Sequence, residues 1–176
     1  MAGASLSRLA RLNSLRKRNL EILEGELAGC AALEPIHTYP EAERGGYLGF
    51  LLRYHPEEAG GWPREAFVHA ARAEGVRISV DRYTCFSPAA QTLHRAPLFN
   101  TLDRSQFGGG LSAVEFRERP DQVHLPVAER VVNELISVPP FTLVRERDVR
   151  LQARAMRKVV EGARRIRDLR DGIVSR

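Results

Sequence analysis

The sequence contains little cysteine and no long apolar run. Cys30 and Cys85 are its only cysteines, and two thiols so far apart make neither a disulfide framework nor a zinc site. We expect both to be reduced and partly buried. No stretch approaches the roughly 20 apolar residues that a membrane span needs, and the first residues lack the apolar core of a signal peptide. These absences exclude disulfide-stapled and membrane-spanning proteins and favour a cytoplasmic chain.

Lysine is scarce as well. Among 27 basic residues, Lys17 and Lys158 are the only lysines, and all others are arginines. Each lysine lies beside arginines in a charged segment, so we expect both amines to be exposed and solvated. A lysine that acts as a nucleophile must lose its proton to react, and the sequence offers only these two unfavourable candidates for that role.

Several chemistry-bearing motifs are also missing. The histidines at 37, 55, 69 and 124 stand alone, without the spacing of metal ligands, so we expect no metal site. The glycine triplet 108–110 follows no strand and precedes no GK[ST], which excludes a phosphate loop. No Gly-x-Ser-x-Gly element of a serine hydrolase occurs.

Two helices with strong periodicity bound the chain. Leucines recur every three to five residues over 5–28 with arginines between them, which predicts an amphipathic helix. Residues 1–20 carry five basic groups and no acidic one. We expect the leucine stripe from Leu6 to Leu27 to lack a partner, because this chain offers no large domain on which it could pack. Apolar residues with helical spacing also predict a last helix over 145–170.

The middle of the chain predicts a small α+β layer. The aromatic and apolar run 47–54 and the alternating segment 76–83 indicate strands, with a helix over 63–74 between them. A second helix opens at Pro126 and continues to the prolines at 139 and 140. A third strand is placed either at 111–116 or near 136–138. Residues 84–124 show no regular period and are predicted to be an irregular loop.

Five blocks in consistent order resemble the DegT/DnrJ/StrS family of pyridoxal phosphate (PLP) dependent sugar aminotransferases. They are LSRLARLNSLRKRNLEILEGELAG (6–29), FLLRYHPEEAGGWPREAFVHAARAEGVRISVDRY (50–83), LHRAPLF (93–99), LPVAERVVNELISVPPF (125–141) and RERDVRLQARAMRKV (145–159). Within the family the chain looks closest to members that aminate cyclitols or related sugar-like ketones. The resemblance covers nearly the whole chain.

The resemblance implies a particular part of that enzyme. Residues 1–30 correspond to the helix connecting the two domains, and residues 31–176 to the small C-terminal domain of a fold-type I aminotransferase, with a mainly antiparallel sheet flanked by helices. The family's large domain, which holds the PLP, the acid at its pyridinium nitrogen and the Schiff-base lysine, has no counterpart here. We therefore expect a truncated or split-gene product, inactive alone and without its own cofactor.

The resemblance also suggests which side chains face the active site. It places His94 on a small-domain loop over substrate and cofactor, with Arg82 and Tyr83 directed toward the same loop. Arg82 is suited to pair with the carboxylate of an amino-acid donor; the alternative is a surface arginine, and for His94 a histidine with local backbone contacts. In a complete enzyme the partners are a keto-sugar or cyclitol, the donor, and a second subunit or a separately encoded large domain.

A different class of function stays open from the residues. The last helix carries Arg154, Arg157, Lys158, Arg164, Arg165, Arg167 and Arg170, a basic face that suits nucleic acid or another partner. Acidic residues interrupt this charge and no aromatic residues interleave for base stacking, so a solvated basic face is the simpler interpretation. Binding of nucleic acid is therefore not expected.

The lysine content generates a first prediction. The purified chain, mixed with PLP and reduced with borohydride, should show only trace pyridoxyl labelling spread over Lys17, Lys158 and the amino terminus, because neither lysine is expected in an enclosed pocket. Peptide mapping by mass spectrometry measures this. Stoichiometric labelling of one lysine, together with amino transfer to a keto-sugar, would contradict it.

Overall fold

A computed structural model describes residues 2–36, 38–42, 49–80, 92 and 124–174, and the structural statements below concern this part of the chain. The chain divides into two units, Met1–Val80 with Glu134–Arg176, and Asp81–Asn133. None of the described helices combines the length and apolarity needed to cross a bilayer. The elements in chain order are α1 (Ala2–Leu27), β1 (Leu33–Pro35), β2 (Phe50–Tyr54), η1 (Pro56–Ala59), α2 (Arg64–Ala73), β3 (Ser79–Val80), α4 (Pro126–Glu134), β4 (Leu135–Val138) and α5 (Glu146–Val174).

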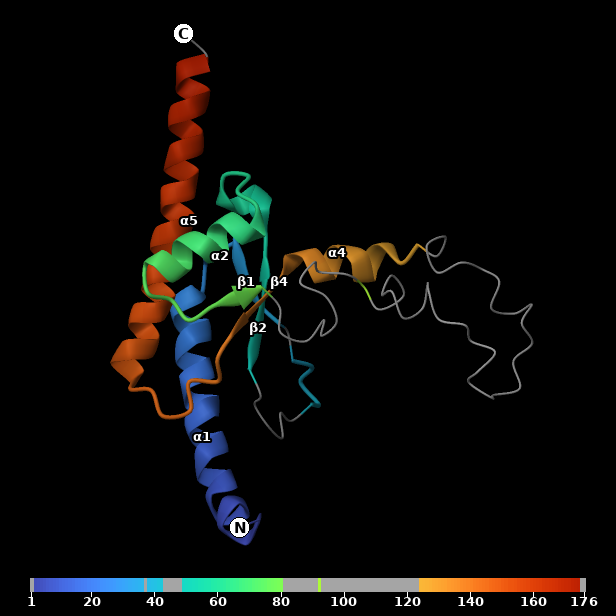
Figure 1. The fold of residues 1–176 in the computed structure, drawn as a ribbon, viewed down its shortest axis with the longest axis vertical. Coiled ribbons are helices and arrows are strands. Elements are labelled where there is room, and N and C mark those ends of the chain that lie inside the picture. The colour runs from blue at the N-terminus through green and yellow to red at the C-terminus, as the bar shows by residue number, and fades with distance from the viewer. Residues whose placement is uncertain (1, 37, 43–48, 81–91, 93–123, 175–176) are drawn as a thin grey trace, which may run out of the picture. The chain divides into compact units, whose positions relative to one another are not determined.

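The first unit is built on a four-stranded sheet. Its strands follow the order β1-β2-β4-β3, and every neighbouring pair is antiparallel. The helices α1, α2 and α5 lie on one side of the sheet (Figure 1). This arrangement confirms the predicted α+β class with an antiparallel sheet flanked by helices. The proposed boundary between a connecting helix and a domain at residue 30 stays a prediction.

One predicted helix is wrong in its second half. We expected the helix starting at Pro126 to continue to the prolines, but α4 ends at Glu134 and the next four residues form β4. Ile136 pairs with Leu52 and Val138 with Phe50, and both of these β4 residues are buried. Burial and pairing thus outweigh the helical spacing. The strand near 136–138 is confirmed, whereas the alternative at 111–116 lies outside the described residues.

The other strands differ from expectation mainly in length. The first expected strand is described as β2, beginning at Phe50. The second is described only as Ser79–Val80 before the described part of the chain stops. β1 was not predicted, because three residues that include Pro35 read as part of a turn-rich link. Proline is tolerated there because β1 is an edge strand of the sheet.

The core forms where the sheet meets the helices. Phe50, Leu52 and Tyr54 alternate with half-exposed residues along β2, so one face of this strand is buried. The Tyr54 ring stacks on Phe67 of α2, with ring centroids 4.8 Å apart. Its hydroxyl donates to the carbonyl of Trp62 at 2.9 Å. Burial raises the pKa of the Tyr54 hydroxyl above its usual range, so this group remains a donor.

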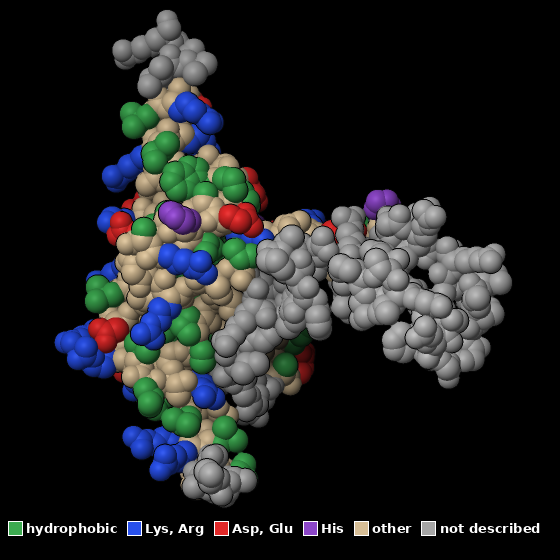
Figure 2. Space-filling model, viewed as in Figure 1, with side chains coloured by type: hydrophobic (Ala, Val, Ile, Leu, Met, Phe, Trp, Pro, Cys, Tyr) green, Lys and Arg blue, Asp and Glu red, His purple; other side chains and the backbone are tan. Residues whose placement is uncertain are grey.

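Two long helices, α1 and α5, run side by side in the same direction (Figure 1). Leu20, Leu23 and Leu27 of α1 are buried. The expectation that the leucine stripe lacks a partner in this chain is therefore wrong for the second half of α1. At the described start of the helix, the Leu6 and Leu9 side chains are 68% and 45% exposed. Figure 2 shows apolar and basic side chains intermingled at that end of the molecule.

Charged groups of α5 secure the C-terminal end of α1. Glu26 accepts hydrogen bonds from Arg150 at 2.6 Å and Arg154 at 3.2 Å. Hydrogen bonds from these two arginines lower the pKa of the Glu26 carboxyl, so it stays ionised. Arg157 donates to the carbonyls of Glu26 and Ala28, which the helix itself leaves without amide partners. The cations thus lie at the negative end of the α1 dipole.

Two adjacent glycines provide a test of the packing between η1 and α5. Gly60 and Gly61 both have a left-handed backbone, with φ of 67° and 78°. A Cβ at Gly60 would lie 2.7 Å from the Ala163 carbonyl oxygen, whereas a Cβ at Gly61 would meet nothing within 4 Å. Gly61→Ala should therefore cost about 1–2 kcal/mol for the backbone alone. Gly60→Ala should cost a further ~1–3 kcal/mol through overlap.

Chemical denaturation of both variants measures this difference in the free energy of unfolding. Because the two variants share the same substitution and the same backbone region, their difference isolates the contact with α5. Equal losses in the two variants would show that η1 does not pack on α5 in this way.

Candidate functional site

The three side chains that the family resemblance selects lie outside the described residues. The described residues do not include Arg82, Tyr83, His94 or most of the loop 84–124, so the roles of these three side chains stay predictions. The described residues do fix where this segment is attached. β3 ends at Val80, and Val80 pairs with Ile136 of β4. The segment 81–133 thus leaves the sheet from one strand and returns into its hydrogen-bonded neighbour.

Two arginines bind the junction where α4 ends and β4 begins, which is the return point of the segment 81–133 into the sheet. Arg53 of β2 donates to the Glu134 carboxylate from Nε at 3.0 Å and from Nη2 at 2.7 Å. Arg64 opens α2 and is almost completely buried, and it donates to the Leu135 carbonyl at 3.1 Å. Its guanidinium also binds Glu65 through two nitrogens, at 3.1 and 2.7 Å. The return point is therefore fixed from both β2 and α2.

The same cluster extends across the sheet to β1. Glu34 lies opposite Arg53 in the strand register and accepts from it at 3.3 Å. The His55 ring lies 2.8 Å from Glu34 and 3.5 Å from Glu57. The hydrogen bond to Glu134, the largest contribution, raises the pKa of Arg53. These charges satisfy one another, so the cluster acts as a structural network.

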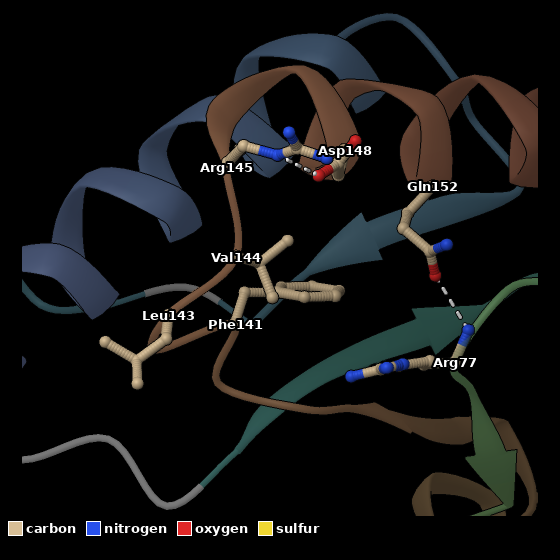
Figure 3. A pocket seen from close by; sticks show the side chains of 7 residues that line it. All are labelled: Arg77, Phe141, Leu143, Val144, Arg145, Asp148 and Gln152. Carbon is tan, nitrogen blue, oxygen red and sulfur yellow. Dashed lines mark hydrogen bonds and ion pairs between the residues drawn. The ribbon is translucent and has the colours of Figure 1, made fainter.

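A hollow with different properties lies between the loop before β3, the β4–α5 connection and the start of α5 (Figure 3). Its volume is about 440 Å³, within the range of small-molecule sites. The Arg77 side chain extends into it beneath the Phe141 ring, while Arg145 and Asp148 border the opposite edge (Figure 3). The complete lining is Arg77, Phe141, Leu143, Val144, Arg145, Asp148 and Gln152.

Two amide side chains hold the walls of this hollow. Gln152 accepts from the Arg77 backbone N–H at 2.7 Å and donates to the Gly75 carbonyl at 3.1 Å. Asn19, fully buried on α1, donates to the carbonyls of Phe141 at 2.5 Å and Val144 at 3.1 Å. Phe141 is held with φ of 46°, a left-handed conformation that a bulky residue rarely adopts.

Sequence patterns gave little warning of these residues. Asn19 is the one residue that the sequence could have indicated, because it lies in the leucine stripe near Leu20 and Leu23. It is buried there, and a buried amide requires hydrogen-bond partners. Its Oδ1 atom has no partner within the described part of the chain. Arg77 and Gln152 stand in ordinary surface contexts, and only the fold brings them together.

The two lysines have the surroundings that the sequence predicts. Lys17 is exposed on α1, and Lys158 is 69% exposed on α5, where it pairs with Glu74 at 2.7 Å. Neither lysine lines the hollow. Because a Schiff-base lysine requires an enclosed position, the described residues do not fit covalent binding of PLP. Among these residues there is also no group of three or more side chains suited to hold a metal ion.

Most basic side chains of α5 make contacts within the chain. Arg154 and Arg157 bind the end of α1, and Arg164 binds the backbone and carboxylate of Glu58. Arg167 and Arg170 each pair with the acidic residue that follows. These contacts leave little free charge for a nucleic-acid surface and do not support the binding-module alternative.

Comparisons with known proteins relate the chain to aminotransferases. L-glutamine:2-deoxy-scyllo-inosose aminotransferase of Streptoalloteichus tenebrarius is 32% identical over 157 residues, which cover 88% of this chain and 35% of the relative. A second relative comes from the same organism and is named as an L-glutamine:3-amino-2,3-dideoxy-scyllo-inosose aminotransferase. It is 31% identical over 126 residues, which cover 68% of this chain and 27% of the relative. The chain thus spans about a third of the length of these relatives. No protein-family model matches it.

A solved structure shares the fold. The crystal structure of DesI in the presence of its TDP-sugar product matches 95% of this chain and 35% of its own, with a TM-score of 0.61 and 19% sequence identity. At this identity the likeness concerns the fold alone. It agrees with the α+β arrangement described above.

The arginines at the return point generate a prediction about stability. Arg64→Met should lower the free energy of unfolding by about 1–3 kcal/mol, because it removes charge-assisted hydrogen bonds from a position that is 4% exposed. Arg53→Met should cost at most about 1 kcal/mol, since its side chain is 31% exposed and water replaces the lost partner. Urea unfolding measures both. A larger loss for Arg53→Met would contradict this order.

Proposed function

We propose that this chain forms the small-domain part of a PLP-dependent sugar or cyclitol aminotransferase of the DegT/DnrJ/StrS type. The observation that carries the proposal is the 32% identity to a 2-deoxy-scyllo-inosose aminotransferase across 88% of this chain. The fold shared with DesI supports the same assignment. The reaction would move an amino group from an amino acid, with L-glutamine the donor named for the relatives, to a keto-sugar or cyclitol, in the cytoplasm.

In this proposal another domain supplies the cofactor chemistry. PLP would be held by a large domain, either encoded separately or carried by a longer form of the protein, because both lysines described here are solvated. PLP provides the carbonyl that accepts the amino group, and no step of that chemistry is assigned to this chain. The chain alone is then inactive. A family-type homodimer is the expected assembly.

The described residues suggest how the chain would serve such an enzyme. The exposed Leu6 and Leu9 on α1 offer an apolar surface for a large domain. Arg53 and Arg64 hold the returning end of the segment 81–133 at Glu134 and Leu135, and the pairing of Val80 with Ile136 holds its other end beside it. That segment carries Arg82, Tyr83 and His94, which we propose to face substrate and cofactor in the assembled enzyme.

A chimeric enzyme tests the proposal. The matching third of the S. tenebrarius 2-deoxy-scyllo-inosose aminotransferase is replaced by this chain, and amino transfer from L-glutamine to 2-deoxy-scyllo-inosose is measured. We expect transfer by the chimera and none by this chain alone or by the relative without its matching third. His94→Ala in the chimera should lower kcat/KM about tenfold or more by removing a substrate contact.

Arg165→Gln is the matched control, because Arg165 is exposed near the end of α5. This variant should leave kcat/KM unchanged. A chimera that folds and binds PLP but transfers no amino group would contradict the proposed function. Equal activity of the His94→Ala chimera would contradict the role of that histidine alone.

A further inference from the structure

The hollow beside the start of α5 contains an arginine, Arg77, that is available to bind a ligand. The Arg77 guanidinium has no hydrogen-bond or ion-pair partner among the described residues, although its backbone N–H binds Gln152. Figure 3 shows this guanidinium extending into the hollow. This sets Arg77 apart from Arg53, Arg64 and the arginines of α5 that bind carboxylates or carbonyls. A guanidinium directed into a hollow is suited to bind an anion.

The remaining charges around the hollow reinforce this preference. Arg145 binds one oxygen of Asp148 at 3.0 Å, and Arg147 approaches the other at 3.5 Å. One carboxylate is thus shared by two guanidinium groups. The nearby Glu146 pairs with Arg18 of α1 at 3.2 Å and is likewise engaged. The rim therefore keeps an excess of positive charge even with its own carboxylate counted.

Part of the lining of the hollow is apolar. Phe141, Leu143 and Val144 line it together with Arg77 (Figure 3), although Phe141 is itself a core residue that is only 3% exposed. Leu143, at the rim, is 81% exposed. A ligand that places a charged group at Arg77 would therefore lay an uncharged body against the aliphatic side chains of Leu143 and Val144. This combination favours an anion with an apolar body over a bare inorganic anion, because the latter has no body to bury.

The walls are positioned before any ligand arrives. Gln152 ties the backbone on both sides of Arg77 to α5, through Gly75 and Arg77. Asn19 ties Phe141 and Val144 to α1 from the buried side. Arg72 adds a bond from Nε to the Ile78 carbonyl at 2.8 Å, just beyond Arg77. Because these anchors are part of the fold, a ligand does not have to order the loops.

We propose that this hollow binds a small organic carboxylate with an apolar or aromatic body. The carboxylate accepts two hydrogen bonds from the Arg77 guanidinium, whose planar fork matches its two oxygens. The body rests on Leu143 and Val144, and Arg145 adds a second positive charge at the rim. This site goes beyond the proposed amino-transfer function and does not depend on it.

The test uses the purified chain and three probes that separate the charge from the body. They are 3-phenylpropionate, 3-phenylpropanol, which lacks the charge, and acetate, which lacks the body. Amide NMR titration gives both the affinity and the place of binding. We expect 3-phenylpropionate to bind most tightly and to shift the signals of residues 75–78 and 141–152. Tighter or equal binding of 3-phenylpropanol would overturn the proposal.

Two arginine variants with the same charge change complete the test. Arg77→Gln should weaken 3-phenylpropionate binding about tenfold to a hundredfold, the range expected when hydrogen bonds to a charged group are lost. Arg165→Gln, remote along α5, should leave the affinity unchanged. An unchanged thermal midpoint for Arg77→Gln is expected, since within the described part of the chain only its backbone makes a hydrogen bond. Equal weakening in both variants, or shifts confined to other residues, would overturn the proposal.

Discussion

The parallel packing of α1 against α5 is the contact on which the first unit depends. Parallel neighbours align their dipoles unfavourably, so this pairing requires compensation. Burial of Leu20, Leu23 and Leu27 supplies the apolar part. Arg157 supplies the polar part by binding two carbonyls at the end of α1, while Arg150 and Arg154 hold Glu26. Together these contacts close the buried face of the sheet, and they place Asn19 against the connection that forms one wall of the hollow.

Local patterns predicted the elements whose burial follows a regular period, and they failed where pairing partners decided. The long helices and the β2 strand have such periods over many residues. β4 does not have such a period, because the helical spacing of Val131, Val132 and Leu135 extends past α4 into residues that form a strand. The cause lies in Leu52 and Phe50, far away in the sequence, whose register with Ile136 and Val138 completes the core. A three-residue strand containing Pro35 carries no period at all.

The candidate sites were less predictable than the fold for the same reason. A family resemblance pointed to Arg82, Tyr83 and His94, which lie outside the described residues. The hollow, in contrast, consists of residues with no common motif. Gln152 and Arg77 are brought together by the packing of α5 beside the loop before β3, and Asn19 reaches the Phe141 carbonyl from the opposite end of the chain. Such a site follows from tertiary packing, so the amino-acid sequence alone does not predict it.

The attachment of the segment 81–133 allows the protein to change in a modular way. Its two ends join strands that are already hydrogen-bonded neighbours, with Val80 opposite Ile136. Lengthening or shortening a connection of this kind changes the closure entropy only logarithmically and leaves the register of the sheet untouched. The length of this stretch can therefore change at little cost in free energy while the sheet, the paired helices and the hollow stay constant. The fold acts as a fixed frame into which stretches of different length and chemistry can be grafted at a single edge.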